Sequence, residues 1–205
     1  MAKVGARMTS VESGETFVFV QTEEENGSHI LIIDMICEPG GGAKGAPMPM
    51  HFHPAQEERF YIQQGVMEYV LDGITGQVQA GESLIIPAGT PHTWRNPSTD
   101  DRLLFRFEFE PASGVEYVFE NMTALSQLGK LRPDGSVPLL ATFRTLYHYS
   151  GNLYLVGIPV WMQKIGIAAG AFMAWILGYP VYHKYDEAVR ARTKLHNAQQ
   201  TAWVD

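Results

Sequence analysis

Two stretches in the first half of this chain, both punctuated by glycine and proline, constrain it most, because together they carry three histidines and a glutamate. His51 and His53 stand two residues apart, so in a β-strand both side chains point to the same face. Glu58 follows a short turn and can enter the same cavity from the next strand. His92 opens a later strand after a tight turn and can supply a third imidazole from another direction. Three imidazoles and one carboxylate form a ligand set for one divalent metal ion.

Short β-prone runs separated by glycine and proline fill the chain as far as Pro111. Many short strands with such breaks predict an antiparallel sandwich or barrel. The last run alternates cleanly and points Phe105, Phe107 and Phe109 at one face, which we expect to be the core. The predicted strands are residues 16–20, 29–37, 50–53, 57–63, 66–71, 77–80, 83–86, 92–96 and 103–110.

The pattern becomes helical after Pro111. Apolar residues recur at helical spacing from Val115 to Leu128, and Gly129 closes that segment. The sequence also predicts an acidic turn at residues 23–27. Further helices are predicted over residues 138–149, 159–178 and 181–200. We therefore expect a β-barrel over residues 1–113 and a helical C-terminal extension over residues 114–205.

The two stretches resemble the two conserved motifs of the cupin superfamily, with every fixed position filled at the family's spacing. These positions are Gly45, His51, His53, Glu58 and Gly65 in the first motif, and Gly81, Pro87, Gly89, His92 and Asn96 in the second. The resemblance covers about the middle third of the chain. It implies a mainly β fold, a double-stranded β-helix barrel of the jelly-roll type. It also implies that the three histidines and Glu58 bind metal and that Asn96 does not.

The ligand types restrict the metal ion. Because the set contains no thiolate, it excludes iron–sulfur clusters and cysteine-type zinc sites, and it leaves Fe(II), Mn(II), Ni(II), Cu(II) and Zn(II) open. Four protein ligands on an octahedral ion leave two positions for a bidentate substrate, or for a substrate and dioxygen. A tetrahedral zinc ion would be closed, which would favour a structural or binding role.

An apolar wall is expected around the ion. By alternation from Glu58, Phe60 and Ile62 of the same predicted strand share its inward face, and residues near the motifs can form the mouth. Such a wall suits a hydrophobic or aromatic small molecule, although plain core packing would explain the same residues. No catalytic acid or base is identified; Tyr69 and Arg106 are the candidates. The candidate substrate-pocket residues are Phe60, Ile62, Trp94, Phe105, Phe107, Met48 and Met50.

Charge and cysteine usage restrict the partners and the compartment. A net charge of −7, without a basic stripe, argues against nucleic-acid binding. The single cysteine, Cys37, rules out an intrachain disulfide and favours a reducing, cytoplasmic location.

Residues 165–182 carry no charge, and small residues recur every four positions within them. We expect this segment to pack on the barrel or on a second copy in a homodimer; membrane contact is the alternative.

The resemblance allows several activities for a chain of this kind. We expect a metal-dependent oxidoreductase of the dioxygenase type that acts on a small, largely apolar or aromatic molecule. Two alternatives remain, since one fold carries many reactions. The first is a non-catalytic module that binds metal or ligand, and the second is an isomerase or lyase in which the metal acts only as a Lewis acid.

Overall fold

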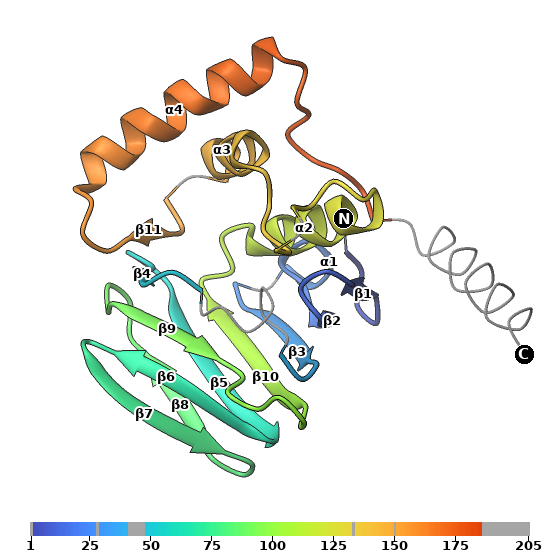
Figure 1. The fold of residues 1–205 in the computed structure, drawn as a ribbon, viewed down its shortest axis with the longest axis vertical. Coiled ribbons are helices and arrows are strands. Elements are labelled where there is room, and N and C mark those ends of the chain that lie inside the picture. The colour runs from blue at the N-terminus through green and yellow to red at the C-terminus, as the bar shows by residue number, and fades with distance from the viewer. Residues whose placement is uncertain (1, 28, 41–47, 133, 150, 186–205) are drawn as a thin grey trace, which may run out of the picture.

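The computed structural model describes residues 2–27, 29–40, 48–132, 134–149 and 151–185, and it shows a mainly β fold followed by C-terminal helices (Figure 1). The strands form two antiparallel sheets, with the helices gathered at one end of them. This confirms the predicted fold class. The six-stranded sheet has the order β1 (Arg7–Ser10), β2 (Glu15–Gln21), β3 (Leu31–Cys37), β10 (Leu103–Glu110), β5 (Glu57–Gln64) and β8 (Ser83–Ile86). The five-stranded sheet has the order β11 (Tyr154–Leu155), β4 (His51–Phe52), β9 (His92–Arg95), β6 (Val66–Leu71) and β7 (Ile74–Gln79).

Strand β10 is central to the core, because it lies between β3 and β5. Its side chains alternate between buried and half-buried, as the sequence predicts. Phe105, Phe107 and Phe109 all point inward and are at most 4% exposed. In the antiparallel register, Phe107 lies opposite Phe60 of β5. The two rings stack with centroids 4.4 Å apart, so the interior of the barrel is filled by aromatic packing.

Strand β3 supplies the neighbouring layer of the core. Its alternate residues are buried, and Cys37 at its end is fully buried as a small apolar side chain. Strand β2 pairs with β3 and places Glu15 opposite Cys37. Glu15 therefore shares the inward face of β2 with Phe17, which puts a carboxyl group inside an otherwise apolar surface.

Three longer helices follow the barrel strands. Helix α2 (Val115–Gln127) packs on the core, where the Phe119 ring lies 4.9 Å from that of Phe17 and 5.8 Å from that of Phe109. Helices α3 (Leu139–His148) and α4 (Val160–Ile176) pack on each other. The short helix α1 (Glu23–Asn26) stands where the sequence predicts an acidic turn, because the Thr22 hydroxyl caps it by accepting a hydrogen bond from the Glu25 amide.

The last predicted helix, over residues 181–200, differs from the structure. Residues 181–185 are not helical, and the remainder lies outside the described residues. Gly178, which has a positive φ of 78°, and Pro180 end the preceding helix α4 (Val160–Ile176), so residues 181–185 do not continue it. None of the helices in the described part of the chain combines the length and apolarity needed to span a membrane.

Candidate metal centre

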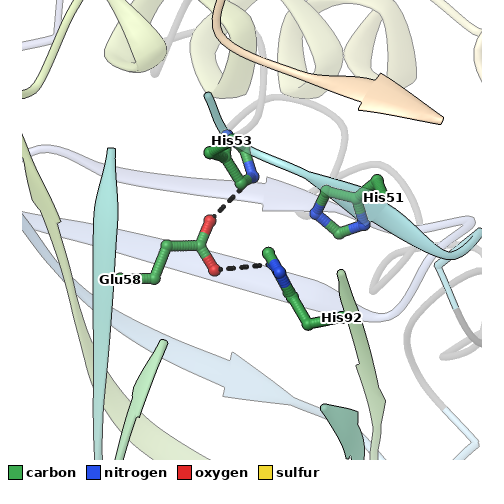
Figure 2. A group of neighbouring side chains, drawn as sticks. All are labelled: His51, His53, Glu58 and His92. Carbon is green, nitrogen blue, oxygen red and sulfur yellow. Dashed lines mark ion pairs between the residues drawn. The ribbon is translucent and has the colours of Figure 1, made fainter. Parts of the chain in front are cut away.

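His51, His53, Glu58 and His92 converge inside the barrel (Figure 2). One potential ligand atom from each lies within 4.8 Å of the others, and all four side chains are buried. The two sheets share the site. The β4 segment and strand β9 of the five-stranded sheet contribute the histidines, with His51 directly opposite His92 in the register. Glu58 comes from β5 of the other sheet, so the cluster joins the two halves of the barrel.

A short loop before β9 positions the third histidine. Gly89 adopts a positive φ of 79°, a backbone conformation that glycine enters without strain. Its amide donates a 2.7 Å hydrogen bond to the carbonyl of His53. The carbonyl of Pro91 accepts a hydrogen bond of 2.8 Å from the Asp72 amide. The first bond ties the segment before His92 to the segment that carries the other two histidines, and the second ties it to the turn after β6.

Each histidine is oriented through its Nδ1 atom. Nδ1 of His51 lies 2.9 Å from the carbonyl oxygen of Pro49, and Nδ1 of His92 lies 2.8 Å from that of Thr90. A carbonyl oxygen can only accept, so both Nδ1 atoms carry the proton. In the neutral form of these two rings the Nε2 atoms are the unprotonated nitrogens, which is the tautomer that a metal ion requires.

Gln56 orients the third ring and was missed by the sequence analysis. Its Nε2 group donates to the carbonyls of Pro111 at 2.7 Å and Ala112 at 3.0 Å. This fixes the amide, so Oε1 faces Nδ1 of His53 at 3.2 Å and accepts a hydrogen bond from it. Gln56 precedes Glu58 by two residues, and residues two apart in an extended segment point to the same face. This spacing is the one sequence signal that could have predicted a buried position for Gln56.

Glu58 lies between two of the histidines. Its Oε1 is 2.9 Å from Nε2 of His53, and its Oε2 is 3.1 Å from Nε2 of His92 (Figure 2). The second pair is in contact but makes no hydrogen bond, so Glu58 Oε2 and His92 Nε2 are buried polar atoms without a hydrogen-bond partner. Such atoms normally have partners. A cation placed among the four side chains would satisfy both, so the residues fit a metal ion.

The protonation states of His51 and Glu58 suit metal binding, whereas at His92 burial alone would lower the pKa but the contact with Glu58 outweighs burial and raises the pKa. Burial, followed by the charges of His92 and His53, lowers the pKa of His51 to about 4. Burial alone would raise the pKa of Glu58, but its contacts with His53 and His92 outweigh burial and lower it to about 2. At neutral pH the cluster therefore presents a carboxylate and a neutral His51 ring, and both are ligand forms.

A mostly apolar cavity of about 320 Å³ opens beside the cluster. Of the predicted pocket residues, Met48, Trp94 and Phe107 line it, and Phe109 lines it as well. Four others do not line it: Phe60, Ile62, Phe105 and Met50.

The strand register explains this division. Phe109 is opposite Glu58, whereas Phe60 and Ile62 are opposite Phe107 and Phe105, progressively further from the ligands along β5 and β10. Phe60, Ile62 and Phe105 are therefore buried in the aromatic core instead. Of the two candidate acid–base residues, Arg106 is engaged by Asp34 in a 2.8 Å ion pair, and neither it nor Tyr69 lines the cavity.

Residues far away in the sequence complete the cavity. Helix α2 contributes Val118, Phe119 and Met122, and the segment after α3 contributes Leu153. Local periodicity gives no indication that these residues approach the barrel mouth, so they could not be predicted from the sequence.

Glu15 is the other carboxylate that lines the cavity besides Glu58, among the residues that the structure describes. Burial raises the pKa of Glu15 to about 7, and the nearby Ser13 hydroxyl offsets only part of that rise. A carboxyl group with this pKa carries and releases a proton near neutral pH. Glu15 is therefore an acid–base candidate that the sequence analysis did not identify.

Comparison with known proteins agrees with the motifs. Residues 35–105 match the family model described as a cupin domain. The chain is 26% identical to the oxidoreductase iacF of Pestalotiopsis fici over 62% of this chain and 66% of that protein. It is 38% identical to quercetin 2,3-dioxygenase of Bacillus subtilis over 44% of this chain and 28% of that protein. The matches thus span between about a quarter and two thirds of these relatives.

A solved structure of an RmlC-like cupin from Shewanella frigidimarina aligns with 53% of this chain and 85% of its own, at 17% identity and a TM-score of 0.42. The family-model match encloses both motifs and all four residues of the buried cluster. Gly45 of the first motif lies outside the described residues. Residues 35–105 of this chain are therefore a cupin domain.

Proposed function

We propose that this protein is a mononuclear metal-dependent oxidoreductase that uses dioxygen to oxidise a small, largely apolar or aromatic molecule. The observation that carries the proposal is the buried three-histidine, one-glutamate cluster, which opens directly into an apolar cavity of about 320 Å³. That volume suits a small organic ligand, and its aromatic lining suits a flat ring system.

The chain's own residues have separate tasks in this proposal. His51, His53, Glu58 and His92 would hold the ion, and a divalent transition metal would supply Lewis acidity and redox chemistry at the head of the cavity. Gln56 keeps the His53 ring in the ligand tautomer. The aromatic wall excludes water from the bound molecule.

Glu15 would handle the proton in this scheme. Its carboxyl lines the same cavity as the cluster, and its pKa of about 7 lets it accept a proton from a phenolic or enolic substrate at neutral pH. A bound substrate would then be held as an anion next to the cation, which favours its oxidation.

The relatives support a reaction of this class without fixing the substrate. One is named an oxidoreductase and another a quercetin 2,3-dioxygenase. Because the matches cover only part of each relative, the flavonol substrate in the second name is a starting point for assays and does not identify the substrate here.

The test combines metal analysis with oxygen uptake. Protein loaded in turn with Fe(II), Mn(II), Ni(II), Cu(II) or Zn(II) is assayed against a panel of flavonols, simple phenols and β-diketones. We expect one ion per chain and oxygen consumption that requires both metal and substrate. Glu58→Gln should lose metal and activity. The matched control, Glu57→Gln, changes the adjacent carboxylate, which pairs with Arg59 instead of the cluster, and should keep both.

Two results would replace the proposal. Turnover that proceeds equally well without oxygen would assign the metal to Lewis-acid chemistry, as in an isomerase or lyase. A tightly bound ion with no turnover and no open coordination position would favour a binding module.

A further inference from the structure

Helix α4 has an unusual distribution of apolar residues. From Val160 to Ile176 its only charged residue is Lys164, so the helix is apolar around its whole circumference. A helix of this composition is normally buried on all sides. In Figure 1 it lies along the outer edge of the molecule beside α3. The described residues therefore leave most of this apolar helix uncovered.

Only one stripe of α4 is covered by the described chain. Its least exposed residues, Ala171 and Ala174, are spaced as one helical face. Gly170 shares that face, and a Cβ there would come within 2.0 Å of the Phe143 ring, so α3 and α4 are in close contact. At the other end of α4, the Gln163 side-chain amide accepts a hydrogen bond from the Leu155 amide and donates one to the Leu155 carbonyl. Packing and hydrogen bonds thus hold α4 in a fixed position.

The opposite face carries large apolar side chains. At 100° per residue, Ile165, Ala169 and Phe172 point away from α3, with Trp161 and Ile176 continuing the same row. The four large members of this row are 57–64% exposed. Their spacing of three and four residues is that of a helix that packs against another helix. Flanking this row are Met162, Met173, Trp175 and Leu177, which are 48–59% exposed.

The uncovered area is large enough for a stable interface. Eight large apolar side chains, each about half exposed, amount to on the order of 700–1,100 Å², taking ~150–250 Å² per large side chain. The largest apolar patch of a typical monomer is about 300–600 Å². A standard protein–protein interface buries about 800 Å² per partner.

We infer that the outer face of α4, centred on Ile165 and Phe172, is the interface at which a second copy of this chain packs to form a homodimer. A two-fold axis near the middle of α4 would set each apolar row against its own copy and would bury both at once.

Charge argues against a lipid surface as the occupant. Interfacial membrane helices combine an apolar face with a basic polar face, whereas α4 has one lysine and the chain carries a net charge of −7.

Sedimentation equilibrium of the full chain from about 1 to 100 μM tests the inference. The wild type should sediment at twice the 22.8 kDa mass of one chain. The double variant Ile165→Lys, Phe172→Lys should sediment as a monomer, with an unchanged circular dichroism spectrum and unchanged metal content. The matched control is Ile74→Lys, which places the same charge at a 72% exposed apolar residue on β7 and should leave the dimer intact.

A cross-link tests the geometry separately. Ala169→Cys places a thiol near the middle of the outer face, and the natural Cys37 is buried. Mild oxidation should yield a covalent dimer from this variant and none from the wild type. A wild-type monomer at 100 μM would overturn the inference. So would a dimer that survives the double lysine substitution, or a monomer that floats with phosphatidylcholine vesicles.

Discussion

Glu15 places an ionisable group where ionisation is unfavourable, so its replacement should stabilise the protein at high pH. Its ordinary pKa of 4.5 is raised to about 7 in the folded protein, chiefly by burial. The folded state thus holds its proton over a range in which the unfolded state has released it. Stability falls as pH rises through this range, because the unfolded state binds fewer protons there.

The magnitude follows from the two pKa values. A difference between 4.5 and about 7 corresponds to at most ~3 kcal/mol, at 1.36 kcal/mol for each pH unit. Because the carboxyl faces a cavity and is not wholly enclosed, we expect ~1–3 kcal/mol. Glu15→Gln keeps the shape and removes the charge. It should leave stability unchanged below pH 4.5 and raise it by this amount above pH 7.

Urea unfolding from pH 4.5 to pH 8, at fixed metal content, measures the effect. The difference in unfolding free energy between Glu15→Gln and wild type should grow from near zero to a plateau. Glu24→Gln, which removes a carboxylate from the exposed surface of α1, is the control and should show no comparable rise. A flat difference for Glu15→Gln would refute the assignment of a buried, proton-holding carboxyl to the cavity.

Three further substitutions test the site and the core. Gln56→Leu should weaken metal affinity about 10–100-fold in a chelator competition titration, because His53 loses its orienting acceptor. Gly65→Ala should cost about 1–3 kcal/mol in thermal unfolding, since it combines a φ of 82° with a Cβ 2.5 Å from a backbone oxygen, whereas Gly73→Ala, with a similar φ and open space, should cost less. Phe107→Ala should cost about 3–5 kcal/mol by urea unfolding, through the cavity it leaves.

Local patterns predicted the elements well. The strands and the three longer helices appear within a few residues of their predicted bounds, because alternation and helical spacing are local properties of the chain. The short strands β1 and β11 were not predicted. Both are four residues or fewer, and β11 is a strand only because it pairs with β4. The division of the chain at residues 113 and 114 stays a prediction.

The cavity depended on long-range packing instead. The alternation of side chains along the strands predicted that Phe105, Phe107 and Phe60 point inward. It could not predict which of them line the cavity and which pack only against other core side chains. That outcome follows from the register of β10 against β5 and from Phe119 of α2, which closes the aromatic cluster. Glu15 and Gln56 became visible only when distant strands and loops were brought together.

The sequence by itself determined which residues can bind a metal, because ligand chemistry belongs to residue type and because parity in a strand fixes the face on which His51 and His53 lie. Tertiary structure alone decided that Glu58 faces them from the other sheet, that Glu15 shares their cavity, and that the described residues leave an apolar face of α4 uncovered. The physical reason is that convergence and burial depend on contacts between segments far apart in the chain, which no local periodicity encodes.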